Sequence, residues 1–124
     1  MNQSIMDNVA AAKKVVPSIS AQEAVKLRGR NDVLFVDVRD AEEVAETGMI
    51  AGAINISRGM LEFRADETTP YHDDAFSRDK KVILYCASGG RSALSGKALL
   101  DMGYADVWNL GAFKDWEESG LPTE

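Results

Sequence analysis

Residues 81–92 read KVILYCASGGRS, and this stretch decides the fold because it joins a buried strand to a helix through a glycine-rich turn. The run 81–86 is apolar on both faces and contains β-branched residues, which is typical of a strand inside a parallel sheet. Gly89 and Gly90 allow a sharp turn, and 92–102 have the apolar spacing of a helix. A strand followed by a helix is the repeating unit of a parallel α/β fold.

The same alternation continues on both sides of this unit. Further strands are predicted at 33–38 (VLFVDV), 53–57 (AINIS) and 105–110 (ADVWNL), and helices at 21–28, 41–47 and 111–120. Ser20 and Asp40 are the expected N-caps of the first two helices. In the helix at 92–102 the apolar face is expected at Leu94, Ala98, Leu99 and Met102. The pattern predicts a three-layer α/β domain, with a central parallel sheet flanked by helices on both faces.

The ends and one long connection depart from this pattern. Residues 1–16 can form a helical turn or two before Pro17, and we expect them to be an N-terminal arm. Residues 17–124 then form one domain, since a chain of 124 residues fits a single core. The polar segment 65–81 contains Pro70 and is expected to be a surface excursion.

Composition excludes several classes of function. The net charge is −6 and the basic residues are scattered, which argues against nucleic-acid binding. No apolar run approaches the roughly 20 residues that span a bilayer, so no membrane partner is expected. A single cysteine cannot form an internal disulfide, which favours a reducing compartment, the cytoplasm by default. His72 is the only histidine and lies in the polar excursion, so no metal site is predicted.

Cys86 is the candidate catalytic residue because it stands at the carboxyl end of a predicted parallel strand, where ligands bind in such sheets. The main-chain N–H groups of Ala87, Ser88, Gly89, Gly90 and Arg91 can converge there, and such a turn holds anions. They would also favour the thiolate over the thiol. We expect the thiol to be open to solvent at the floor of this pocket. The competing interpretation is a small buried cysteine that only fills space.

Three polar residues are expected near the same sheet edge. Asp37 and Arg39 follow a buried strand, and Arg39 is expected to pair with Asp40 or Glu43 and fix the loop. Ser92 opens the helix after the glycines and is a further candidate for the surroundings of the thiol.

Two ordered blocks carry a family resemblance, namely DVRDAEEVAETGMIAGAINIS (37–57) and YCASGGRSALSGKALLDMGYADVWNLGAFKDW (85–116). From about Ser18 to Leu121 the chain resembles the single-domain rhodaneses, which are sulfurtransferases. The resemblance implies that Cys86 attacks a small anionic sulfur donor such as thiosulfate, becomes a persulfide and passes the sulfur to cyanide, a thiol or a protein. It implies no cofactor.

The chain departs from the family pattern at named positions. Met49 stands where the family usually has histidine, and is expected to change packing rather than remove a catalytic base. Ala87 and Ser88 are neutral where some thiosulfate enzymes are basic. Two other functions stay open. One is a non-enzymatic rhodanese-like module for sulfur carriage, redox sensing or protein interaction, and the less favoured one is a cysteine phosphatase, whose loop would be one residue longer.

Overall fold

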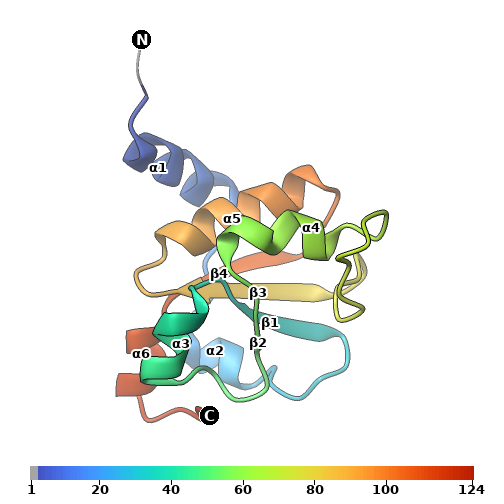
Figure 1. Cartoon of the computed structure of the whole chain (residues 1–124). Coiled ribbons are helices and arrows are strands. Elements are labelled where there is room, and N and C mark those ends of the chain that lie inside the picture. The colour runs from blue at the N-terminus through green and yellow to red at the C-terminus, as the bar shows by residue number, and fades with distance from the viewer. Residues whose placement is uncertain (1–2) are drawn as a thin grey trace.

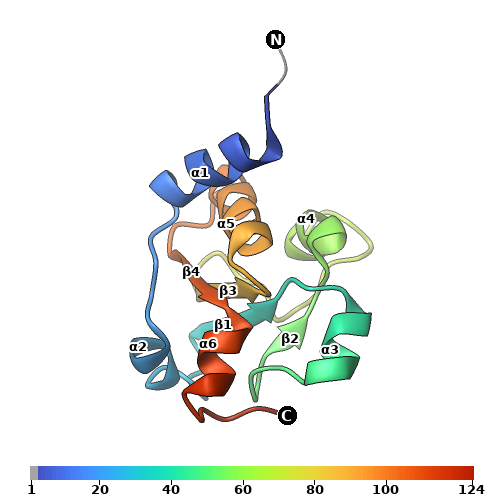
Figure 2. The same cartoon turned by 90° about the vertical axis from the view of Figure 1, so that its left-hand side faces the viewer.

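The computed structural model describes residues 3–124 and is built on a four-stranded parallel sheet with the strand order β2-β1-β3-β4 (Figures 1 and 2). The elements in chain order are α1 (Ile5–Val15), α2 (Ala21–Val25), β1 (Val33–Asp37), α3 (Ala41–Thr47), β2 (Ile54–Asn55), the 3-10 helix η1 (Arg58–Met60), α4 (Leu61–Ala65), β3 (Lys81–Cys86), α5 (Gly90–Asp101), β4 (Val107–Ala112) and α6 (Phe113–Glu118). The predicted α/β class with a central parallel sheet is confirmed.

Helices cover both faces of the sheet. Figure 2 shows α4 and α5 on one face with α1 outside α5, while α2 and α6 lie on the other face. Because strand side chains alternate between faces, β3 contributes Val82, Leu84 and Cys86 to the core under α5 and Ile83 and Tyr85 to the core over α6. Strand β3 runs between β1 and β4, so both of its faces and both of its edges are covered.

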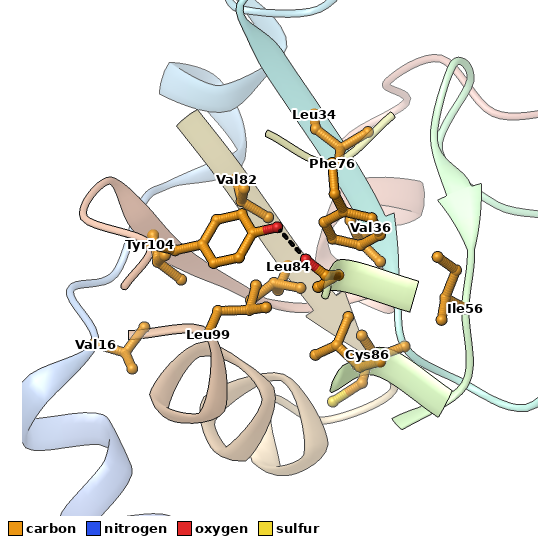
Figure 3. Packing of buried hydrophobic residues seen from close by; sticks show 14 residues of the cluster. Val16, Leu34, Val36, Ile56, Phe76, Val82, Leu84, Cys86, Leu99 and Tyr104 are labelled. Carbon is orange, nitrogen blue, oxygen red and sulfur yellow. Dashed lines mark hydrogen bonds between the residues drawn. The ribbon is translucent and has the colours of Figure 1, made fainter. Parts of the chain in front are cut away.

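The core under α4 and α5 is the larger of the two clusters, and Cys86 belongs to it (Figure 3). Tyr104 lies in the same cluster and donates a hydrogen bond from its hydroxyl to the carbonyl of Ala65 at 2.7 Å. This bond ties the end of α4 to the segment that precedes β4. The excursion between α4 and β3 consists of turns, as predicted, but Phe76 anchors it in the same core with 4% of its surface exposed.

The N-terminal segment packs on the domain, whereas the sequence predicted an appended arm. Helix α1 has 11 residues and buries Val9 and Ala12, and Val16 after it belongs to the core. The contact with α5 is close at Gly96, where a Cβ atom would lie 2.8 Å from Cγ1 of Val16. The apolar spacing 9, 12, 16 is that of a buried helix face, and it is the signal that the arm interpretation overlooked.

Helix α5 begins two residues earlier than predicted, and its buried face differs. Leu99 is buried as expected, but Leu94, Ala98 and Met102 are only partly covered. The fully buried positions include the small residues Ser92, Ala93, Ser95 and Gly96. The reason is that α5 is held between the sheet and α1, so small side chains are needed where it approaches its neighbours closely.

Two features are absent from residues 3–124. None of their helices is both long enough and apolar enough to cross a membrane. No three metal-ligating side chains gather in one place among them.

Candidate active site

The loop after β3 is short and its shape depends on glycine. Cys86 ends the strand and Gly90 begins α5, so three residues make the connection. Gly89 has a φ of +97°, a conformation that other residues adopt only with strain. A Cβ atom there would also lie 3.4 Å from Cα of Gly111 in the neighbouring strand. Gly89 therefore lets the loop turn back toward Cys86.

Main-chain N–H groups approach the sulfur of Cys86, but they are not the five expected from residues 87–91: those that act on it belong to Ser88, Gly89 and Ser92. The N–H of Gly89 donates to Sγ at 3.0 Å, and the N–H groups of Ser88 and Ser92 also stabilise a negative charge there. The hydroxyl of Ser92 lies 3.5 Å from Sγ. The first turn of α5 and the loop before it thus surround the sulfur with hydrogen-bond donors.

The expected exposure of the thiol is wrong. Cys86 has 0% of its surface exposed and lies within the apolar cluster under α5 (Figure 3). The reason is its place on the central strand, on the face that α4 and α5 cover. The exposed residues are Ala87 and Ser88, whose small side chains form the outer side of the loop. A reagent must therefore reach the sulfur past these two residues.

The pKa of the Cys86 thiol lies below its ordinary value. Burial alone would raise it, because charge is unfavourable away from water. Hydrogen bonds from the Ser92 hydroxyl and from the main chain of Ser92, Ser88 and Gly89 act in the opposite direction and outweigh burial. This environment favours the thiolate, which is the nucleophilic form.

Ser92 connects the sulfur to a residue that the sequence analysis missed. Its hydroxyl donates to Oδ1 of Asn109 at 2.7 Å, and Nδ2 of Asn109 donates to the carbonyl of Gly89 at 3.3 Å. Asn109 lies on β4 beside Leu84, two residues after the buried Val107. Since strand side chains alternate, it shares a face with Val107. An amide on the apolar face of a core strand was the signal available in the sequence.

Arg91 does not present a free charge to the pocket. Its guanidinium forms two hydrogen bonds with the carboxylate of Glu43, at 2.6 and 2.9 Å. The hydrogen bond from Arg91 lowers the pKa of Glu43 although partial burial opposes the shift. Glu43 also accepts a hydrogen bond from the N–H of Asp40, the N-cap of α3. The pair of Glu43 and Arg91 therefore joins the start of α3 to the start of α5. Glu43 is the second residue that the sequence analysis left out of the site.

Arg39 pairs with Asp37 rather than with Asp40 or Glu43, so the expected partner is wrong. Both side chains are buried, with 3% and 0% exposed, and Nη2 of Arg39 lies 2.6 Å from Oδ2 of Asp37. Residues two apart at a strand end project to the same side, which explains the choice of partner. Arg39 also donates to Thr47 and to the carbonyl of Gly48, and lies 4.4 Å above the ring of Phe113.

Met49 lies in the connection between α3 and β2, where Arg39 donates a hydrogen bond to the carbonyl of Gly48. The N–H of Met49 donates to the carbonyl of Glu124 at 2.9 Å, and the N–H of Glu124 donates to the carbonyl of Met49 at 2.8 Å. The next N–H, that of Ile50, donates to the buried hydroxyl of Tyr85 at 3.0 Å. Burial raises the pKa of Tyr85, and the charge of Asp37 raises it further, so this hydroxyl stays protonated. The contacts of Met49 are thus structural, beside the Arg39 cluster.

A cavity of about 400 Å³ opens beside the loop. It is bounded by Ala87 of the loop, by Arg39 and Thr47, and by α6, which contributes Phe113, Lys114, Glu117 and Glu118. Its apolar wall is the Phe113 ring, and its outer residues carry charges of both signs. The cavity is large enough for a small molecule beside the exposed side of the loop.

Comparison with known proteins places this geometry in a family. The family model described as "Rhodanese-like domain" matches residues 20–119. A protein named sulfurtransferase from Allochromatium vinosum is 35% identical over 98 residues, which cover 78% of this chain and 83% of that protein.

Two solved structures are similar over most of this chain. A Rhodopseudomonas palustris protein of unknown function, described as a possible tyrosine phosphatase, is 37% identical with a TM-score of 0.92, covering 100% of this chain and 96% of its own. The polysulfide-sulfur transferase homodimer from Wolinella succinogenes is 31% identical with a TM-score of 0.76, covering 95% of this chain and 85% of its own. With the family match and the sulfurtransferase relative, these similarities show that the chain belongs to the rhodanese-like family of single-domain sulfurtransferases.

Proposed function

We propose that this protein transfers a sulfane sulfur from a donor to a thiophilic acceptor through a persulfide on Cys86. In the first step the Cys86 thiolate attacks the outer sulfur of the donor, a new S–S bond forms, and the donor's remaining group leaves with the electron pair of the broken bond. In the second step an acceptor thiolate or cyanide attacks the outer sulfur of the persulfide. The S–S bond breaks, and Cys86 returns to its thiolate form.

The hydrogen bond of 3.0 Å from the N–H of Gly89 to Sγ of Cys86 carries this proposal. Hydrogen bonds to charged groups are stronger than those to neutral groups. An N–H group that points at Sγ therefore stabilises the thiolate more than the neutral thiol. The thiolate is the leaving group of the second step as well as the nucleophile of the first. The same N–H group therefore supports both steps.

Glu43 favours a donor less highly charged than thiosulfate. Thiosulfate is a dianion, and the one cation of the loop, Arg91, is already paired with Glu43. Ala87 and Ser88 add no charge. We infer that the preferred donor is an organic persulfide, which carries one negative charge on its sulfur, whereas inorganic polysulfide is a dianion like thiosulfate. Cys86 does not line the cavity between Ala87 and Phe113, but the cavity adjoins the exposed side of the loop, and the non-reacting part of a donor or acceptor would lie there.

The test is sulfur transfer to cyanide, read as thiocyanate, with thiosulfate, an organic persulfide and polysulfide as alternative donors. Wild type is expected to turn over with at least one donor, fastest with the organic persulfide, and Cys86→Ser is expected to add nothing to the uncatalysed rate with any of the three. Replacement by serine nearly keeps the size of the side chain, so a cooperative thermal unfolding transition of Cys86→Ser provides the folding control. Equal thiocyanate formation by the two proteins would refute the proposal.

A phosphatase is the second candidate, because of the description of the Rhodopseudomonas relative. The loop argues against it. Four residues separate Cys86 from Arg91, Ser92 stands where a phosphatase would have its arginine, and Arg91 is held by Glu43. We expect no Cys86-dependent hydrolysis of p-nitrophenyl phosphate by the preparations that transfer sulfur. Hydrolysis that disappears in Cys86→Ser would favour the phosphatase instead.

A further inference from the structure

We propose that Asn109 is a positioning residue that competes with Cys86 for the single proton of the Ser92 hydroxyl. The use made of this competition rests on the proposed sulfur transfer, but the competition itself is a property of the resting protein. The three side chains are buried, with exposed fractions of 0% for Cys86, 0% for Ser92 and 6% for Asn109. In such a place a polar group depends on its protein partners.

The orientation of the Asn109 amide is fixed by its second partner. Nδ2 faces the carbonyl of Gly89 at 3.3 Å, and Oδ1 faces the hydroxyl of Ser92 at 2.7 Å. The opposite orientation would place Oδ1 against a carbonyl oxygen, where neither atom has a proton to donate. Oδ1 is therefore an acceptor for Ser92, and the hydroxyl proton of Ser92 points away from the sulfur.

The main chain of Asn109 holds the amide in this place. Its N–H donates to the carbonyl of Pro17 at 2.8 Å, and its carbonyl accepts from the N–H of Ile19 at 3.1 Å. An irregularity in the pairing of β3 with β4 follows at once, since Leu84 pairs with Asn109 but Tyr85 pairs with Gly111. The amide thus lies between a fixed backbone and the loop.

The two charge states of Cys86 make different demands on Ser92. The neutral thiol can donate its own proton to Oγ of Ser92, 3.5 Å away, while Ser92 donates to Asn109. The thiolate has no proton, so Ser92 must turn its hydroxyl to the sulfur and leave Oδ1 of Asn109 without that partner. Asn109 therefore opposes formation of the thiolate, whereas Ser92 favours it.

This balance suits a sulfur carrier. A thiolate that is stabilised too strongly is a poor nucleophile, but a thiol of low pKa is a better leaving group. A hydroxyl that is held by Asn109 at rest, and released to the sulfur as the persulfide breaks, serves both steps. One proton with two acceptors is sufficient for this exchange.

The charged groups around Cys86 make no hydrogen bond or ion pair with the Asn109 side chain. Arg91 of α5 is paired with Glu43 of α3, and this hydrogen bond is the main cause of its raised pKa; a charge on Cys86 and the nearby Asp40 raise it further. At the end of β1, the charges of Asp37 and Arg39 compensate each other in a buried ion pair. The sides formed by η1 and α4 and by the segment after β2 contribute apolar residues such as Leu61 and Ile56.

The test is the pKa of Cys86, measured from the pH dependence of its alkylation by iodoacetamide. In Asn109→Leu, which keeps the size but removes the acceptor, the pKa is expected to fall by about one unit, since the Ser92 proton becomes free for the thiolate. In Ser92→Ala it is expected to rise by about one unit. The double variant is expected to match Ser92→Ala, because the proposed effect of Asn109 on the sulfur passes through that hydroxyl.

The sign of the shift separates this role from a merely structural one. If Asn109 only held the loop, its loss would loosen the N–H groups around the sulfur and raise the pKa. A rise or no change in Asn109→Leu, or an equal fall with Ser92 absent, would overturn the inference. Asn109→Ala is the second variant, with the same expected sign, should the leucine prevent folding. No sulfur donor is present, so the outcome is independent of whether the protein transfers sulfur.

Discussion

Replacing Asp37 by asparagine keeps the shape of a buried side chain and removes its charge. Asp37 accepts three hydrogen bonds from the guanidinium of Arg39 and one from the main-chain N–H of Arg39. The exposed fractions of the two side chains are 3% for Arg39 and 0% for Asp37. In Asp37→Asn the guanidinium remains buried with its charge uncompensated, and the new amide hydrogens face its N–H groups. We expect a large loss of stability.

The magnitude follows from the burial. Removing one partner of a buried ion pair typically costs about 3–5 kcal/mol, because the other charge stays out of water. For a chain of 124 residues this lowers the unfolding temperature by roughly 10–20 °C. The measurement is urea and thermal unfolding of the variant beside wild type.

The chain offers a matched control in Arg30 and Asp32. They have the same spacing and two hydrogen bonds of 2.9 Å, but their side chains are 58% and 62% exposed. Water can replace that pair, so Asp32→Asn is expected to leave the unfolding temperature nearly unchanged. If Asp37→Asn were as mild as Asp32→Asn, the reasoning from burial would be refuted.

Three further predictions follow from individual contacts. Glu43→Gln frees the charge of Arg91 and should raise the rate with thiosulfate relative to the organic persulfide in the thiocyanate assay; an unchanged ratio would contradict the assigned role. Gly96→Val should cost about 1–3 kcal/mol of unfolding free energy by crowding α1, whereas Gly59→Val, with open surroundings, should cost less in the same urea titration. Because the folded-state pKa of Cys86 is lowered, wild type should gain stability over Cys86→Ser as pH rises from the folded pKa toward about 8.5, the unfolded value; a difference that is flat with pH, or that falls, would count against the shift.

The sequence predicted most of the backbone around the site, because local signals determine it. The run 81–86 is a strand with the predicted first and last residues, and the helix predicted at 41–47 lies between Asp40 and Gly48. Gly89 takes a positive φ, which residues other than glycine adopt only with strain. Period and turn chemistry are properties of short segments, so one sequence is enough to read them.

Tertiary contacts decided the rest. The burial of Cys86 depends on what covers its face of the sheet, and the partner of Arg91 lies 48 residues away, at Glu43. Neither can be found from spacing in one segment. The pairing of Arg39 with Asp37 and the inward position of Asn109 were accessible, because both follow from the alternation of side chains along a strand.

The most direct test of sulfur transfer is the intact mass of the protein after brief exposure to polysulfide and removal of excess reagent. Wild type should gain the mass of one sulfur atom and lose it again on addition of a small thiol, whereas Cys86→Ser should gain none. A wild-type mass that never changes, or a gain that persists without Cys86, would contradict the central claim that this buried sulfur carries the transferred atom.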